Sequence, residues 1–176
     1  MALDASDIAA RVLAALPASD ARPAREALVP TIEVGATEMP QVLAFLRDEP
    51  GLECRLFVDA TAVDREAAGG LIEVIYVVRS IVSFSDSIVV KTAVDAADPV
   101  MPTSSGVYAG ANWAEREIYD MFGVRFEGHP DLRRILMYPE FEGHPLRKSY
   151  PYQKRQPLVP ERDPLANPWP KRHGGV

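Results

Sequence analysis

Apolar and polar positions in the first half of the chain follow two different periods. Apolar residues spaced three or four apart predict an opening helix that ends at Pro17. A short apolar run predicts a strand at 28–34, and helical spacing returns at 39–46, where Pro40 fits the first turn. Three further strands are predicted at 55–63, 71–78 and 88–94.

The last predicted helix covers 112–122, with Gly123 placed to cap its C-terminus. The dipeptides Asp98-Pro99 and Met101-Pro102 mark a loop before it. The order of elements is then helix, strand, helix, three strands and helix. This order predicts an α+β fold with a ferredoxin-like sheet that carries helices on one face.

The composition of the chain changes after Gly128. Residues 1–128 carry 10 Lys and Arg against 20 Asp and Glu, whereas residues 129–176 carry 9 against 5 and hold nine of the sixteen prolines. A proline-rich basic segment without periodicity builds no core of its own, so it is either disordered or laid across another surface. We therefore expect an α+β body at 1–128 and an extended basic tail at 129–176.

Several classes of protein are disfavoured by what the sequence lacks. The single cysteine, Cys54, cannot form an internal disulfide or hold a four-thiolate iron–sulfur cluster, and we expect it to act as a small apolar residue. No dinucleotide or triphosphate loop is recognisable. No apolar run approaches the roughly 20 residues of a membrane span, and the N-terminus lacks a signal-peptide pattern, so we expect a cytoplasmic protein. The acidic body does not favour nucleic acid.

The densest run of charged, aromatic and turn residues lies between residues 110 and 151. It contains, in order, Glu115-Arg116-Glu117, Tyr119-Asp120-Met121-Phe122-Gly123, Gly128-His129-Pro130-Asp131-Leu132-Arg133-Arg134-Ile135-Leu136 and Phe141-Glu142-Gly143-His144-Pro145-Leu146-Arg147-Lys148. These motifs resemble those of the thirty-kilodalton subunit, or C subunit, of respiratory complex I, the proton-pumping NADH:quinone oxidoreductase. The sequence departs from the family pattern at 137–140 and at Ser149, which affects local contacts in a turn.

The resemblance implies a structural subunit of the peripheral arm of a bacterial complex I, on the cytoplasmic face of the inner membrane. The chain would lie beside the D subunit, which forms most of the quinone site, and near the B subunit, which carries the terminal cluster. It would meet the membrane only through the complex. FMN, iron–sulfur clusters, NADH and quinone would belong to other subunits, while this chain would hold no catalytic residue, cofactor or metal. The residues expected at the partner interface or in the structural signature are Glu115, Arg116, Glu117, Asp120, His129, Arg133, Arg134, His144, Arg147 and Lys148.

Glu117 falls in the apolar half of a helical wheel drawn for the last predicted helix, and the opposite half holds Glu115, Arg116 and Asp120. A carboxylate among apolar side chains needs a cation or a proton. We interpret Glu117 as one partner of a structural ion pair with Arg133 or Arg134, with a proton-relay carboxylate as the alternative. Arg116 and Asp120, four residues apart, would form a weak surface pair.

His129 and His144 each stand between a glycine and a proline. Glycine permits positive φ and proline fixes the next φ, so each histidine is expected at a bend where its ring bonds backbone groups. Metal binding is the alternative, but two imidazoles are too few for zinc and His173 lies near the C-terminus.

The basic residues of the tail are the expected contacts with partner subunits, and they are Arg133, Arg134, Arg147 and Lys148. The alternative is a solvated basic tail, and the family resemblance favours docking. A chain truncated after Gly128 should then keep its folded body and fail to enter the complex.

Three other functions are compatible with parts of the sequence. The nearest is the equivalent subunit of a related membrane-bound hydrogenase, or of a complex fed by another electron donor. A free-standing enzyme that uses Glu117 with His129 or His144 would show turnover by the isolated chain. A metal-binding module would carry stoichiometric zinc or iron.

Overall fold

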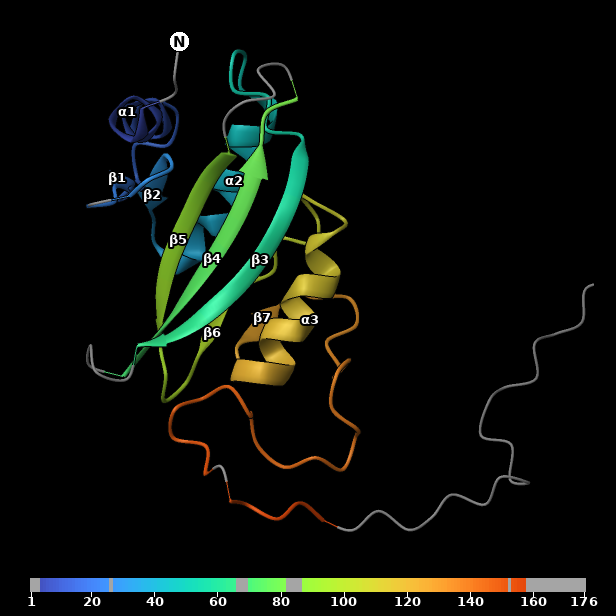
Figure 1. Cartoon of the computed structure of the whole chain (residues 1–176). Coiled ribbons are helices and arrows are strands. Elements are labelled where there is room, and N and C mark those ends of the chain that lie inside the picture. The colour runs from blue at the N-terminus through green and yellow to red at the C-terminus, as the bar shows by residue number, and fades with distance from the viewer. Residues whose placement is uncertain (1–3, 26, 66–69, 82–86, 152, 158–176) are drawn as a thin grey trace, which may run out of the picture.

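The computed structural model describes residues 4–25, 27–65, 70–81, 87–151 and 153–157, and Figure 1 traces the chain. The helical elements are α1 (Ala5–Ala15), the 3₁₀ turn η1 (Ala36–Glu38), α2 (Met39–Asp48) and α3 (Ala111–Phe122). The strands are β1 (Arg22–Pro23), β2 (Thr31–Glu33), β3 (Leu56–Arg65), β4 (Leu71–Arg79), β5 (Ser87–Asp95), β6 (Val100–Pro102) and β7 (Arg125–Glu127).

The main sheet has five strands in the order β1-β2-β5-β4-β3. β2 runs parallel to β5, and every other neighbouring pair is antiparallel. The chain leaves β2, crosses through α2 and then forms three consecutive antiparallel strands, β3, β4 and β5. The last of them, β5, lies beside β2 and runs in the same direction. A register shift at Val58 breaks the regular pairing of β3 near its start.

The core lies between one face of this sheet and the helices. Every second residue of β4, from Ile72 to Val78, is fully buried, as the alternation of apolar and polar positions predicts. Four apolar residues of α2 complete this layer, and α3 packs beside β3. Figure 1 shows α2 and α3 on the same side of the sheet, while α1 packs on the edge formed by β1 and β2. The predicted α+β fold is thus confirmed.

A second, small sheet was not predicted. β6 and β7 pair in parallel, with Met101 opposite Phe126, and both of these side chains are buried. Each strand has three residues, and β6 contains the Met101-Pro102 dipeptide that we interpreted as a loop. Because β6 precedes α3 and β7 follows it, this sheet fixes both ends of that helix to the body.

The other boundaries differ modestly from the prediction. The strand expected at 28–34 is shorter, at Thr31–Glu33, and the two-residue strand β1 precedes it. Cys54 is buried, and burial raises the pKa of its thiol to about 11, as suits a small apolar residue. His173 lies outside the described residues. No described helix has the length and apolar character needed to cross a membrane.

The tail after β7 contains neither helix nor strand in its described part, residues 129–151 and 153–157. It folds back beneath α3 in Figure 1 instead of leaving the body directly. The division of the chain at residue 128 stays a prediction, but the two parts are in close contact through residues 129–148.

Candidate functional site

α3 presents three of its four charged residues to the interior of the molecule. Glu115 and Asp120 are 0% exposed and Arg116 is 6% exposed, whereas Glu117 is exposed and Trp113 is 64% exposed. The predicted orientation was therefore wrong, because α3 is covered on two sides. The sheet and the loop before α3 cover the side that carries Glu115, and the tail after α3 covers the side that carries Asp120.

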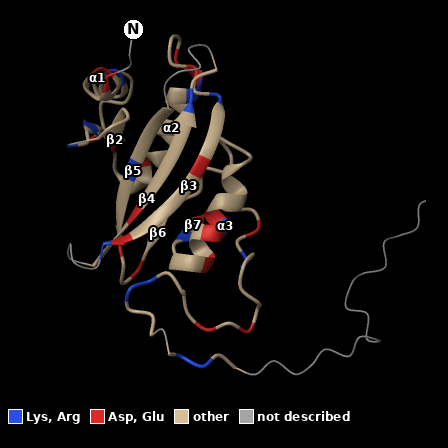
Figure 2. Cartoon of the chain, viewed as in Figure 1, with Lys and Arg blue, Asp and Glu red and all other residues tan. Residues whose placement is uncertain are grey.

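The ion pairs predicted for this helix were also wrong. Glu117 does not pair with Arg133 or Arg134, because Arg134 pairs with Asp120 at 2.7 Å and Arg133 with Asp131 at 3.0 Å. Arg116 and Asp120 do not pair with each other either. Their side chains turn inward toward the tail, where each meets different groups. The charge map of Figure 2 shows acidic positions gathered on α3 and basic segments along the chain that follows it.

Asp120 is the anchor of the tail. Its Oδ2 accepts three consecutive backbone N–H groups, from Ile135, Leu136 and Met137, at 3.1, 2.8 and 2.9 Å. Its Oδ1 accepts the Arg134 guanidinium at 2.7 Å. Burial disfavours the charge on Asp120, but the three amides and Arg134 together outweigh burial and hold its pKa below the usual value. Asp120 is therefore ionised at neutral pH.

Arg134 and His144 join this anchor to a second bend of the tail. The Arg134 guanidinium also donates to the Gly143 carbonyl at 2.9 Å, and it lies 5.8 Å from the centre of the Phe141 ring. The His144 Nδ1 donates to the Asp120 carbonyl at 3.0 Å. Burial is the main cause of a lowered pKa for His144, so the ring is neutral at neutral pH. This ring bonds a backbone group, as a turn role requires.

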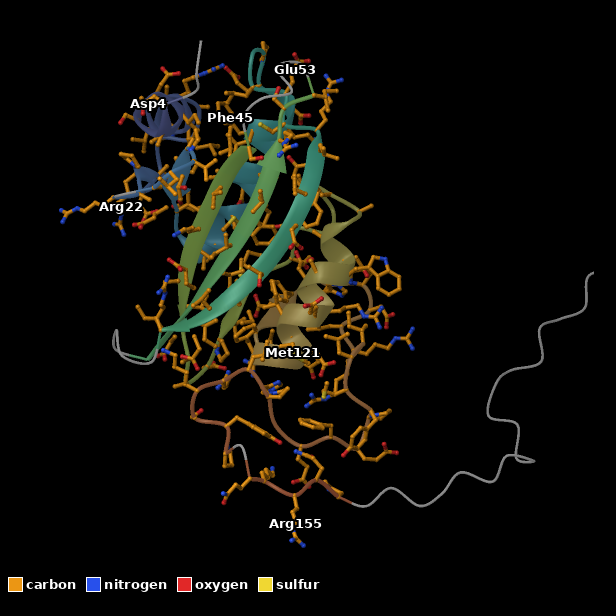
Figure 3. The ribbon with its side chains drawn as sticks, viewed as in Figure 1. Asp4, Arg22, Phe45, Glu53, Met121 and Arg155 are labelled. Atoms are coloured by element: carbon orange, nitrogen blue, oxygen red, sulfur yellow. The ribbon has the colours of Figure 1, made fainter. Side chains whose placement is uncertain are left out.

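The C-terminus of α3 is completed by residues far along the chain. The last four carbonyls of a helix lack partners within it. In α3 the Tyr119 carbonyl accepts the Gly123 N–H, and the Asp120 carbonyl accepts from the His144 ring and the Arg134 guanidinium. The Met121 carbonyl accepts the Leu146 N–H, and the Phe122 carbonyl accepts from the Arg147 guanidinium. Arg147 also donates to the Ala96 carbonyl at 3.0 Å, which ties the tail to the end of β5. Figure 3 labels Met121 at this end of the helix, where side chains of the tail gather.

Two features of this junction require a glycine at position 123. Its φ of 79° is in the left-handed region, as predicted for a helix cap. A Cβ placed there would lie 2.6 Å from the His144 ring, so the bend of the tail can close on the helix only over a glycine.

Glu115 forms a second buried cluster, one and a half turns from Asp120. Its Oε1 accepts the Tyr76 hydroxyl at 2.9 Å and the Ser104 N–H at 2.7 Å, and its Oε2 accepts from Thr103 Oγ1 at 2.5 Å. Burial raises the pKa of Glu115, although its three hydrogen bonds and nearby His129 oppose the rise. The pKa of Tyr76 is also well above its ordinary value, through burial and the adjacent Glu115.

His129 holds the first turn of the tail against α3. Its Nδ1 accepts the Asp131 N–H at 3.0 Å, so Nε2 carries the hydrogen that is donated to the Asn112 carbonyl at 3.1 Å. This pattern also corresponds to a turn role. Arg116 also bonds the tail, because its Nε donates to the Arg133 carbonyl at 3.2 Å. The Arg116 guanidinium lies over the Trp113 ring, 5.0 Å from the ring centre.

The expected site residues thus divide into two groups. Those that hold the tail to the body are Arg116, Asp120, His129, Arg134, His144 and Arg147, while Glu115 holds the loop before α3. Those left exposed are Glu117, Arg133 and Lys148. Tyr76 and Thr103 belong to the site and were not predicted, because a tyrosine at a buried position of an alternating strand reads as ordinary core. Among the described residues, no three His, Cys, Asp or Glu side chains are grouped so as to hold a metal ion.

Known proteins match both the sequence and the fold. A family model described as respiratory-chain NADH dehydrogenase, 30 Kd subunit, matches residues 32–156. The C subunit of NADH-quinone oxidoreductase from Trichlorobacter lovleyi is 46% identical over 123 residues, which are 69% of this chain and 74% of that protein. The C subunit from Methylorubrum extorquens is 43% identical over 121 residues, which are 69% of this chain and 54% of that protein. The chain thus matches about half the length of the second relative.

Solved structures show the same architecture. A chain from the membrane-bound sulfane sulfur reductase, an archaeal respiratory membrane complex, aligns with a TM-score of 0.66 at 27% identity, over 84% of this chain and 85% of that one. A trypsin-resistant fragment of Nqo5 aligns with a TM-score of 0.50 at 25% identity, over 71% of this chain and 99% of the fragment. The protein therefore belongs to the family of the 30 kDa subunit of respiratory-chain NADH dehydrogenase.

Proposed function

We propose that this chain is a structural, non-catalytic subunit of the peripheral arm of a proton-translocating NADH:quinone oxidoreductase. The observation that carries the proposal is the use of the family motifs within the fold. Arg116 and Asp120 of α3 hold the tail to the body, and Glu115 holds the loop before α3. This arrangement gives a rigid shape to a chain whose relatives are named as subunits of that enzyme.

The chain lies on the cytoplasmic face of the bacterial inner membrane, beside the D subunit, which forms most of the quinone site, and near the B subunit, which carries the terminal cluster. Electrons pass from NADH through FMN and iron–sulfur clusters in other subunits to quinone. The single cysteine supports this division of labour, because one thiolate cannot hold a cluster.

The contact surface for these partners is the outer side of α3 and of the tail. It contains Trp113, which is 64% exposed, together with Leu136 and Leu146, which are each 55% exposed. The exposed cations Arg133 and Lys148 lie in the same segment. Exposed tryptophan, large aliphatic and arginine side chains are typical of the residues that dominate binding energy in protein interfaces. Arg134 and Arg147, which we also expected at this interface, are half-buried and bond acceptors of this chain.

Two comparisons bear on the choice of complex. The 46% identity to a subunit of NADH-quinone oxidoreductase exceeds the 27% identity to the chain of the sulfane sulfur reductase, so an NADH-linked complex is favoured over a related respiratory complex. The other two alternatives, a free-standing enzyme and a metal-binding module, gain no support from the site, where the two histidines bond backbone groups.

The test is purification of the tagged chain from its native membrane, followed by identification of its partners and assay of NADH:quinone activity. We expect the quinone-site and terminal-cluster subunits to accompany the chain. The double variant Arg133→Glu with Leu136→Asp should abolish this association while the variant chain stays folded. Arg22→Glu is the control, because Arg22 is similarly exposed and lies at the opposite end of the body (Figure 3). Recovery of the chain with a different set of subunits, or normal assembly of the double variant, would contradict the proposal.

A further inference from the structure

The cluster around Glu115 contains a hydroxyl group with more oxygen neighbours than it has hydrogens. Thr103 Oγ1 lies 2.5 Å from Glu115 Oε2 and 2.8 Å from Ser105 Oγ, and it accepts the Ser105 N–H at 3.1 Å. A threonine hydroxyl has one hydrogen, so it donates to only one of these two oxygens. The other oxygen must donate to Thr103.

Two arrangements of the hydrogens satisfy this condition, and they differ by one proton. If Glu115 is ionised, Ser105 donates to Thr103 and Thr103 donates to the carboxylate. If Glu115 is protonated, its hydroxyl donates to Thr103 and Thr103 donates to Ser105. Both arrangements use the same oxygen positions, so the cluster can take up or lose a proton without moving a heavy atom.

The three oxygens also lead from the interior toward the surface. Glu115 is 0% exposed, whereas Thr103 and Ser105 are both half-buried and so reach solvent. A proton that binds the Ser105 oxygen lets Ser105 pass its own hydrogen to Thr103, which passes its own to Glu115 Oε2. Both hydroxyls end neutral, and the carboxylate has gained one proton.

We propose that Glu115 is a buried proton-binding site that exchanges protons with solvent through the hydroxyl groups of Thr103 and Ser105. The inference does not depend on the proposed function, since it rests on this cluster alone. It also places the buried acid of the motif at Glu115 and not at Glu117, which is exposed.

The groups that face Glu115 favour proton binding over a permanent ion pair. They are Tyr76 from β4, Thr103 and Ser104 from the loop after β6, and His129 from the turn after β7. No described lysine or arginine pairs with Glu115, and the His129 Nε2, at 4.0 Å, gives its hydrogen to Asn112. Arg116, the next residue of α3, faces Asp131. Burial without a paired cation raises the pKa of Glu115, so the proton is retained at a higher pH than on a free glutamate.

The test is an NMR titration of the full chain labelled with ¹³C and ¹⁵N. We expect the side-chain carboxyl carbon of Glu115 to titrate with a midpoint above the value of about 4.3 for free glutamate. The amides of Ser104 and Ser105 should report the same midpoint. Glu117→Gln is the matched control on the same helix, and it should leave the Glu115 midpoint unchanged. A Glu115 midpoint at or below about 4.3 would overturn the proposal.

A pair of variants tests the path separately from the site. Thr103→Ser keeps the hydroxyl, so the Ser105 amide should still follow the Glu115 midpoint. Thr103→Val removes the hydroxyl at nearly equal size, and the Ser105 amide should then stop following it. A Ser105 signal that follows Glu115 equally in both variants would show that the hydroxyl chain is not the path. The titration of the unmodified chain decides the site even if Thr103→Val does not fold.

Discussion

Replacement of Asp120 by alanine should release the tail from the body. The Asp120 carboxylate accepts three backbone N–H groups and one guanidinium while it is itself 0% exposed. Asp120→Ala leaves all four donors without their acceptor, and the Arg134 side chain, 18% exposed, loses its counter-charge. No other carboxylate is placed to replace it in the described part of the tail.

The size of the effect follows from these contacts. A buried donor left without a partner costs about 1–3 kcal/mol, but Leu136 is exposed and its neighbours are half-buried, so water replaces part of what the three amides lose. Loss of one partner from a buried ion pair costs about 3–5 kcal/mol. We therefore expect Asp120→Ala to lower the free energy of unfolding by about 3–5 kcal/mol, a large part of the 5–15 kcal/mol that is usual for a domain.

Urea unfolding followed by circular dichroism measures this loss, and limited proteolysis shows whether the tail is released. Glu117→Ala is the matched control, an exposed acid on the same helix, and should change stability by less than about 0.5 kcal/mol. Because the pKa of Asp120 is lowered in the folded chain, its contribution is complete above about pH 3.9 and is lost as the pH falls through the folded value. The difference in unfolding free energy between the unmodified chain and Asp120→Asn should therefore become smaller as the pH falls below about 3.9. Equal losses for Asp120→Ala and Glu117→Ala would refute the anchor.

Three further changes test the junction between α3 and the tail. Gly123→Ala should lower the free energy of unfolding, measured in urea, by more than about 1 kcal/mol, because alanine disfavours positive φ and its Cβ would clash with the His144 ring. Gly106→Ala is the control and should cost less, because an added Cβ there meets open space. Arg134→Lys keeps a positive charge but loses the fork that spans two acceptors, so we expect a loss of about 1–2 kcal/mol; an unchanged urea midpoint would contradict this. Truncation after Gly128 should lower the thermal unfolding midpoint of the body, because it removes tail groups such as Arg147 that bond the end of α3. An unchanged melting curve would instead support a body that is stable without the tail.

The main layers of the fold could be predicted because their apolar residues alternate with the period of the element that carries them. The fully buried positions of β4 alternate with less buried ones, and α2 follows helical spacing with Pro40 in its first turn. The small sheet of β6 and β7 could not be predicted in this way. Strands of three residues are too short to show a period, and their pairing joins residues on opposite sides of α3 in the sequence, such as Met101 and Phe126.

The prediction of which side of α3 faces solvent was wrong for a different reason. A helical wheel assumes that charged residues face water, and Glu115 and Asp120 face interior hydrogen-bond donors instead. Those donors are mostly backbone N–H groups, which every residue except proline has and which therefore leave no trace in the sequence. The family motif marked these positions as special without giving their direction. The sequence indicated Arg133 or Arg134 as a tail partner of the helix, and Arg134 has this role, although with Asp120 and not with Glu117.

The late completion of the α3 terminus also sets the order in which the chain can mature during its synthesis. Residues 22–95 contain every strand of the main sheet, so this layer can assemble while α3 is still inside the ribosome. α3 itself ends at Phe122, yet the group that closes its last carbonyl, Arg147, emerges 25 residues later. Asp120 lacks its donors until residues 134–137 emerge, and the helix end stays open until Arg147 emerges. A pause or a truncation in that interval would leave a half-finished subunit that quality-control proteases could recognise before assembly.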